Sequence, residues 1–163
     1  MKPVFKPSIF ALICVTVALA LSACSKSDTP ETLILGDWKQ AEAITIDQAG
    51  VSVSMTDGTV SYAKDGTSKG TMAMSIGGMP EEFANYNINT TGKWRIEDNM
   101  LVESLVDAKV TSASGSPQAA AIATQMKAGM LAQAEGKSEI RELTKASLIV
   151  HQPEVDMTMT FKR

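Results

Sequence analysis

A chain of 163 residues, 44% of them hydrophobic, is long enough to fold as one domain with a sizeable core. Its 15 basic and 18 acidic side chains give a net charge of −3 without a basic run that could neutralise phosphates, so we expect no nucleic-acid partner. With one His, two Cys and no Gly-x-Ser-x-Gly turn, phosphate loop or zinc-ligand spacing, the sequence predicts neither an enzyme nor a cofactor or metal site.

Residues 1–23 have the order of a secretory signal peptide. Lys2 and Lys6 provide the positive start, and an apolar run from Ile9 to Leu21 follows. This run is too short to span a bilayer comfortably, and it ends in small residues. The segment therefore predicts export rather than a transmembrane anchor.

The motif Leu21-Ser22-Ala23-Cys24 at the predicted cut resembles the lipoprotein box of bacterial lipoproteins. The resemblance implies that a diacylglycerol is attached to the Cys24 thiol and that the mature chain begins there, held to the membrane by buried acyl chains. Ser25, which is not Asp, implies an outer-membrane lipid anchor, and we expect the domain to face the periplasm. The alternative is an ordinary secreted protein in which Cys24 lies near the cut by chance.

Processing at Cys24 changes the composition of the chain. Loss of Lys2 and Lys6 leaves 13 basic and 18 acidic side chains, and loss of Cys14 leaves Cys24 as the single cysteine. A lipidated mature chain would therefore have no disulfide, and its core would hold the fold unaided. Residues 24–32 are polar and predict a short lipidated tether, and residues 33–163 form the predicted domain.

Alternation of apolar and polar residues predicts that most of this domain is β-strand. Val51, Val53 and Met55, for example, alternate with serines. Turn signals stand at Asp57-Gly58, Asp65-Gly66, Thr91-Gly92 and Asp98-Asn99. The predicted strands are residues 38–46, 51–55, 59–63, 71–76, 93–96, 101–110, 138–143 and 147–152, with 155–162 a possible ninth. This spacing is typical of an antiparallel up-and-down meander.

One segment, near residues 117–135, predicts a helix inserted in the strand series. Ser116 can cap it, Pro117 suits its first position, and Gly136 stands just past its expected end. The repeat of Ile122, Met126 and Met130 makes a narrow apolar stripe. We expect this helix to pack on the sheet or plug one barrel end, the alternative being a membrane-surface or lid helix.

The Gly-x-Trp motif of Gly36 and Trp38 resembles that of lipocalins and of bacterial lipocalin-like lipoproteins. Further likenesses are Asp65-Gly66-Thr67, the strand 92–96 with its Asp98-Asn99 turn, the pair 142–143 and 148–150, and the closing residues 160–163. The resemblance implies an all-β, calycin-type barrel of about eight strands. It further implies that Trp38 packs across the closed end beneath a basic side chain, Arg163 or Arg95, in a structural role.

The same resemblance implies binding of a small hydrophobic ligand, such as a lipid or fatty acid, inside the barrel. The expected apolar lining is Tyr62, Met72, Met74, Phe83, Tyr86, Trp94, Met157 and Met159. The loop 77–80 is either a mobile flap over the mouth or a plain connection. The alternative from another class is a filled barrel that acts in envelope assembly through its surface.

Methionine is abundant, and Met72, Met74, Met157 and Met159 form two Met-x-Met pairs. Thioethers are soft ligands, so a periplasmic Cu(I) site is a third hypothesis, against the plain reading that these residues pack a core or line a greasy pocket. His151 is more simply a hydrogen-bonded or surface residue than a ligand. The carboxylate pairs Glu81-Glu82 and Glu97-Asp98 fit solvated loops.

Overall fold

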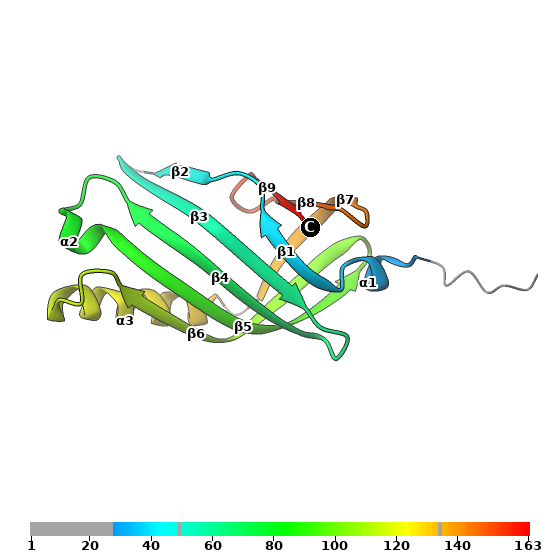
Figure 1. Cartoon of the computed structure of the whole chain (residues 1–163), viewed down its shortest axis with the longest axis horizontal. Coiled ribbons are helices and arrows are strands. Elements are labelled where there is room, and N and C mark those ends of the chain that lie inside the picture. Colours follow the sequence, from blue (N-terminus) through cyan, green and yellow to red (C-terminus); the bar gives the residue numbers. More distant parts are fainter. Residues whose placement is uncertain (1–27, 49, 134) are drawn as a thin grey trace, which may run out of the picture.

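The computed structural model describes residues 28–48, 50–133 and 135–163 (Figure 1). The predicted signal peptide 1–23 and the predicted lipidation site Cys24 lie outside the described residues. Within the described ranges, no helix has both the length and the apolar character needed to cross a membrane.

Three helices and nine strands make up the described chain. In order they are α1 (Pro30–Leu33), β1 (Gly36–Gln40), β2 (Ile44–Gln48), β3 (Val51–Tyr62), β4 (Thr67–Ile76), α2 (Glu81–Ala84), β5 (Asn85–Glu97), β6 (Met100–Ser112), α3 (Pro117–Ala132), β7 (Glu135–Leu143), β8 (Ser147–Gln152) and β9 (Met157–Lys162).

All strand pairs are antiparallel, and the strands follow the order β1-β9-β8-β7-β6-β5-β4-β3-β2. An additional pairing of β1 with residues 59–62 of β3 closes the ring, so eight strands form the barrel and β2 continues along the first half of β3. The predicted all-β, up-and-down antiparallel barrel of about eight strands is confirmed. The possible ninth strand is present as β9.

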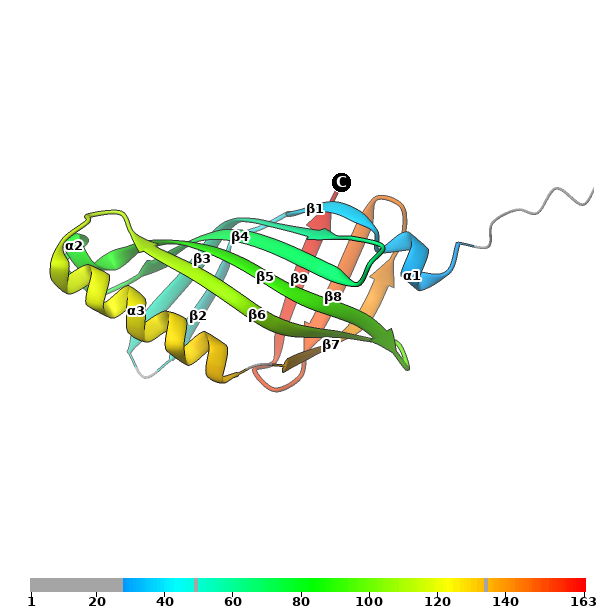
Figure 2. The ribbon, with the colours of Figure 1, turned by 90° about the horizontal axis from the view of Figure 1, so that it is seen from below.

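Strands β3 to β6 are longer than the others and project beyond the ring (Figure 1). We call this projection the extension; it comprises β2, α2, α3 and residues 51–56, 71–76, 85–91 and 107–112. Because β7 pairs only with residues 100–104 of β6, the rest of β6 has no strand on that side, and α3 runs along it instead (Figure 2).

Two predicted turns lie inside continuous strands, each at a β-bulge. The segments 51–55 and 59–63 are one strand, β3, which has an extra residue between Thr56 and Thr59, whereas Thr91-Gly92 lies in β5 opposite a bulge of β6 at Val106. Asp57 adopts a φ of 53°, and the Gly58 N–H donates to Gln40 Oε1 at 3.0 Å. A Cβ at Gly58 would clash with that amide oxygen. An Asp-Gly pair suits a bulge as well as a turn, which explains the wrong prediction.

Other boundaries also differ from the predictions. The predicted strand 38–46 is interrupted at residues 41–43 and forms β1 and β2. Strand β5 begins at Asn85, eight residues before the predicted start, because its Asn residues face outward while Tyr86 and Ile88 are buried. Helix α1 occupies part of the predicted tether, since Pro30 suits a first helical position and the Thr32 hydroxyl donates to the Thr29 carbonyl.

Helix α3 confirms the predicted inserted helix. The Ser116 hydroxyl accepts the Ala119 N–H at 3.2 Å, and Ala119 and Ala123 are buried where the helix packs on β6. The Lys127 ammonium also donates to Asp107 at 2.8 Å. The helix ends at Ala132, however, and Gly136 belongs to β7 rather than to a helix cap.

Candidate ligand-binding cavity

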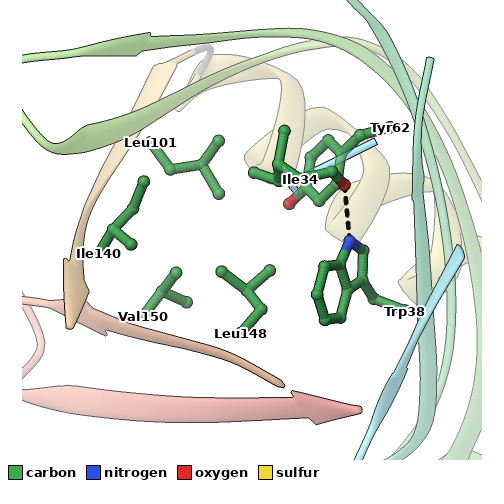
Figure 3. Close-up of a cluster of buried hydrophobic side chains, with 7 residues drawn as sticks. All are labelled: Ile34, Trp38, Tyr62, Leu101, Ile140, Leu148 and Val150. Carbon is green, nitrogen blue, oxygen red and sulfur yellow. Dashed lines mark hydrogen bonds between the residues drawn. The ribbon is translucent and has the colours of Figure 1, made fainter. Parts of the chain in front are cut away.

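The end of the barrel next to α1 is closed by packed apolar side chains (Figure 3). We call this group the closed-end cluster; it consists of Ile34, Trp38, Tyr62, Leu101, Ile140, Leu148 and Val150, all less than 9% exposed. The Trp38 indole N–H donates to the Ile34 carbonyl at 2.7 Å, which ties β1 to the residue that follows α1.

Arg163, and not Arg95, lies over the Trp38 indole. The guanidinium carbon is 3.9 Å from the ring centroid, a cation–π distance. The same guanidinium donates to the carbonyls of Leu33 and Leu35 at 2.7 and 2.6 Å, so it holds the chain after α1 against the barrel. Arg95 instead faces outward and pairs with Glu97 and Glu135.

Beyond the closed-end cluster, the barrel encloses a cavity of about 280 Å³. Its walls come from all nine strands and from Gln133, which follows α3. The apolar lining residues are Ile44, Met55, Val60, Tyr62, Met72, Leu101, Leu105, Val150, Met159 and Phe161. The lining thus begins at the closed-end cluster and reaches Ile44 and the exposed Gln133 on the side of the extension.

Three of the eight predicted lining residues, Tyr62, Met72 and Met159, line this cavity. The structure places the other five elsewhere. Trp94 packs on Tyr62 edge-to-face with ring centroids 5.6 Å apart, and its indole N–H donates to the Ala63 carbonyl. Trp94 lies on the inner face, where it packs against the closed-end cluster. Its contacts with Tyr62 and the Ala63 carbonyl keep the indole ring away from the cavity.

Met74 and Tyr86 are cross-strand partners in the extension, and Phe83 lies in α2, so these three residues are displaced from the cavity along the strands. Met157 lies opposite Gln152 near the other end of β9. Strand alternation assigns a face to each residue but not a position along the barrel axis, which is why the sequence pattern does not separate these four residues from those that line the cavity.

The loop 77–80 precedes α2 at the tip of the extension, and all four of its residues are exposed. Its first residue is tied down, because the Gly77 N–H donates to the Ser52 carbonyl at 2.6 Å. None of the four lines the cavity, so the plain connection describes this loop better than a flap over the mouth.

Sequence reasoning missed a carboxyl group in the cavity wall. The side chain of Glu103 faces inward between Leu101 and Leu105, and the Tyr62 hydroxyl donates to its Oε1 at 3.1 Å. Burial raises the pKa of Glu103 despite this hydrogen bond. Burial and the adjacent Glu103 together raise the pKa of Tyr62 well above its usual value. The signal was available, because Leu101, Glu103 and Leu105 alternate and therefore share one face of a strand.

The described residues contain no cluster of three or more His, Cys, Asp or Glu side chains placed to hold a metal ion. His151 hydrogen-bonds to the Thr158 hydroxyl at 3.2 Å, and its other ring nitrogen is 3.8 Å from Asp156. Of the two Met-x-Met pairs, only Met72 and Met159 reach the cavity. Glu81, Glu82, Glu97 and Asp98 are all exposed.

Comparisons with known proteins identify no family. No family model matches the chain, and no curated protein matches it. One solved structure that matches is an uncharacterized protein from Bacteroides eggerthii DSM 20697. It is 13% identical, covers 80% of this chain and 98% of its own, and superposes with a TM-score of 0.46, too low to support a functional argument. The strand order and its closure by β1 and β3, independently of this match, make the chain an eight-stranded antiparallel barrel compatible with a lipocalin-like domain.

Proposed function

We propose that this chain is a membrane-anchored lipoprotein that binds a small hydrophobic ligand inside its barrel. The observation that carries the proposal is the cavity of about 280 Å³ next to the closed-end cluster. Small-molecule sites in proteins are concave, mostly apolar and about 300–1,000 Å³ in volume, so this cavity is just below the lower end of that range. A single acyl chain or a compact apolar molecule is the kind of ligand that it suits.

The chemistry of the wall supports an apolar ligand. Branched and aromatic surface comes from Leu101, Leu105, Val150 and Phe161. Flexible thioether side chains come from Met55, Met72 and Met159. Methionine side chains are unbranched and polarizable, so they adapt to ligands of slightly different shape. Burial of apolar ligand surface against this wall would provide about 25 cal/mol per Å².

The anchor is a separate part of the proposal and rests on the motif ending in Cys24. Acylation of this thiol would hold the protein at the outer membrane, with the barrel in the periplasm. Labelled palmitate should be incorporated into the full chain expressed in a Gram-negative bacterium, and the Cys24→Ser variant should lose the label and leave the membrane fraction. A chain that is secreted without label would overturn this part.

The cavity favours ligand binding over a filled barrel that works through its surface. Exposed large hydrophobic residues among the described ones are scattered at Val51, Met79, Val106 and Val155. Single exposed apolar residues are ordinary on a protein surface.

Native mass spectrometry of residues 25–163, which contain every described element, tests the binding proposal directly. We expect a discrete adduct that disappears after organic extraction and a fluorescent apolar probe that then binds. Met72→Trp should fill the cavity and weaken probe binding about tenfold or more, equivalent to about 1.4 kcal/mol. Val106→Trp, on the exposed outer surface, is the matched control. A bare protein that binds no apolar probe would overturn the proposal.

A further inference from the structure

The cavity wall contains one acidic group in an otherwise uncharged surface. Among the described residues that line it, Glu103 is the only side chain of the Asp, Glu, Lys, Arg and His types. The polar remainder of the lining consists of Ser, Thr and Gln residues with the Tyr62 hydroxyl. The Glu103 carboxyl therefore determines the sign of the electrostatic potential inside the cavity, because no other described side chain of these types lines it.

Among the described residues, no cation pairs with Glu103, and its one side-chain hydrogen bond comes from Tyr62. The residues facing it across the strand pairs are Trp94 on β5 and Gly136 on β7, neither of which is charged. The nearby cations Arg95 and Lys137 lie opposite Val102, one residue along β6, and so belong to the outer face.

The position of Glu103 along the barrel gives the cavity a direction. The hydrogen-bond donor Tyr62 belongs to the closed-end cluster, as does Leu101, which shares the inner face of β6 with Glu103. On the side of the extension, the apolar lining is Met72, Met55 and Ile44, and the polar lining is the uncharged Thr71, Thr90, Thr91 and Gln133. The acidic group therefore lies at the deep end of the cavity, and the far end is uncharged and carries the methionine and isoleucine surface.

We propose that the cavity selects a cationic amphiphile, whose amine or ammonium head pairs with the Glu103 carboxylate beside the Tyr62 hydroxyl while its apolar tail extends toward Met72 and Ile44. This inference rests on the proposed function and names the ligand class. A buried carboxylate without a cation is costly, and a bound ammonium would supply the missing charge and a second hydrogen-bond donor.

The same charge opposes a fatty acid as the natural ligand. A carboxylate head at the deep end would face Glu103 at close range, and two carboxylates that share a site cannot both stay ionised without a large cost. A fatty acid would have to bind with its head toward the extension or carry a proton. A fatty alcohol lacks charge and should bind with intermediate affinity.

Competition among three molecules of equal chain length tests the inference. Decylamine, decanol and decanoate would each displace a neutral fluorescent probe from residues 25–163 at neutral pH. We expect decylamine to bind at least about tenfold more tightly than decanoate. In Glu103→Gln this preference should disappear through weaker amine binding, while decanol affinity changes by less than about twofold. Glu142→Gln, an exposed position on β7, is the control and should keep the preference.

The outcomes separate the two proposals. Tighter binding of decanoate than of decylamine, or an amine preference that survives in Glu103→Gln, would overturn the cationic assignment and leave the proposed function standing. Failure of the probe and of all three molecules to bind would overturn the proposed function itself. Because Glu103→Gln retains a polar side chain of the same size, bound decanol also reports that the variant is folded.

Discussion

The closed end of this barrel and the extension differ in how completely their apolar side chains are buried. At the closed end, Trp38 and Leu148 are no more than 1% exposed, and hydrogen bonds from Arg163 fasten the chain over them. In the extension, Tyr86, Ile88 and Ala108 are buried, but the apolar residues of β2, β3 and β4 on the inner face are only partly buried, namely Ile44, Ile46, Val53, Met55, Met72, Met74 and Ile76. Helix α3 buries Ala119 and Ala123 but leaves its larger Met126 only partly covered.

This contrast shows that one continuous sheet can separate stability from binding. Apolar side chains that are fully buried stabilise the fold, whereas half-exposed ones still have area available for another molecule. The cavity lies at the boundary between the two regions, with its deep wall in the first and its far wall in the second.

The largest difference should come from truncating one apolar side chain in each region. Trp38→Ala removes a buried indole and its hydrogen bond to Ile34, so we expect a loss of about 3–5 kcal/mol in the free energy of unfolding. Met126→Ala, at a half-exposed site of α3, should cost about 1 kcal/mol or less. Urea titration of both variants measures this difference, and similar losses would show that the extension is part of the stabilising core.

Removing the cation over Trp38 should have a smaller effect. Arg163→Ala loses the cation–π contact and two hydrogen bonds to backbone carbonyls, and we expect a loss of about 1–2 kcal/mol. Arg141→Ala is the matched control, because this exposed Arg pairs only with Glu139 on its own strand. An unchanged urea midpoint for Arg163→Ala would show that the cation–π contact and these two hydrogen bonds do not contribute to stability.

The carboxyl at the boundary predicts a pH effect. Burial raises the pKa of Glu103 in the folded state above its ordinary value of 4.5, so the folded protein holds this proton more tightly than the unfolded chain. Its contribution to stability is therefore full below that value and is lost as the pH rises through the folded pKa.

Glu103→Gln cannot ionise at this position, so its stability relative to the original chain should increase from about pH 4 to about pH 8. Urea unfolding across this range measures the difference between the two proteins, which removes the effect of other carboxyls. Asp65, Glu97 and Asp107, whose pKa values are lowered by hydrogen bonds and ion pairs, change both proteins equally. A constant difference would contradict the prediction.

The smallest effect is expected at Tyr86. Its buried hydroxyl has no hydrogen-bond partner among the described residues, so Tyr86→Phe should leave stability unchanged or raise it by up to about 1 kcal/mol. Tyr62→Phe makes the same chemical change but removes the donor to Glu103, and it should be destabilising. Equal thermal unfolding midpoints for the two variants would contradict this contrast.

The barrel could be predicted from the sequence because alternation of apolar and polar residues reports a strand with one buried face. The limits of that pattern explain the errors. Asp57-Gly58 has turn chemistry but forms a bulge, since β3 continues on both sides to pair with β4. The face of Met74 and Trp94 was predictable, but neither lines the cavity, because alternation says nothing about which neighbours cover a side chain. The apolar pattern does not indicate Glu103, because a carboxyl on the inner face of a strand departs from the usual exposure of Glu side chains.

Helix α1 has a consequence for the orientation of the molecule at a bilayer. It packs beside the closed end, and only five residues separate Pro30 from Cys24. Six residue steps span at most about 20 Å even when fully extended. Under the proposed acylation of Cys24, the closed end would therefore stand next to the lipid headgroups, and the extension would point into the aqueous compartment. A ligand would then exchange with molecules or carriers in that compartment, rather than by sliding directly out of the leaflet that holds the anchor.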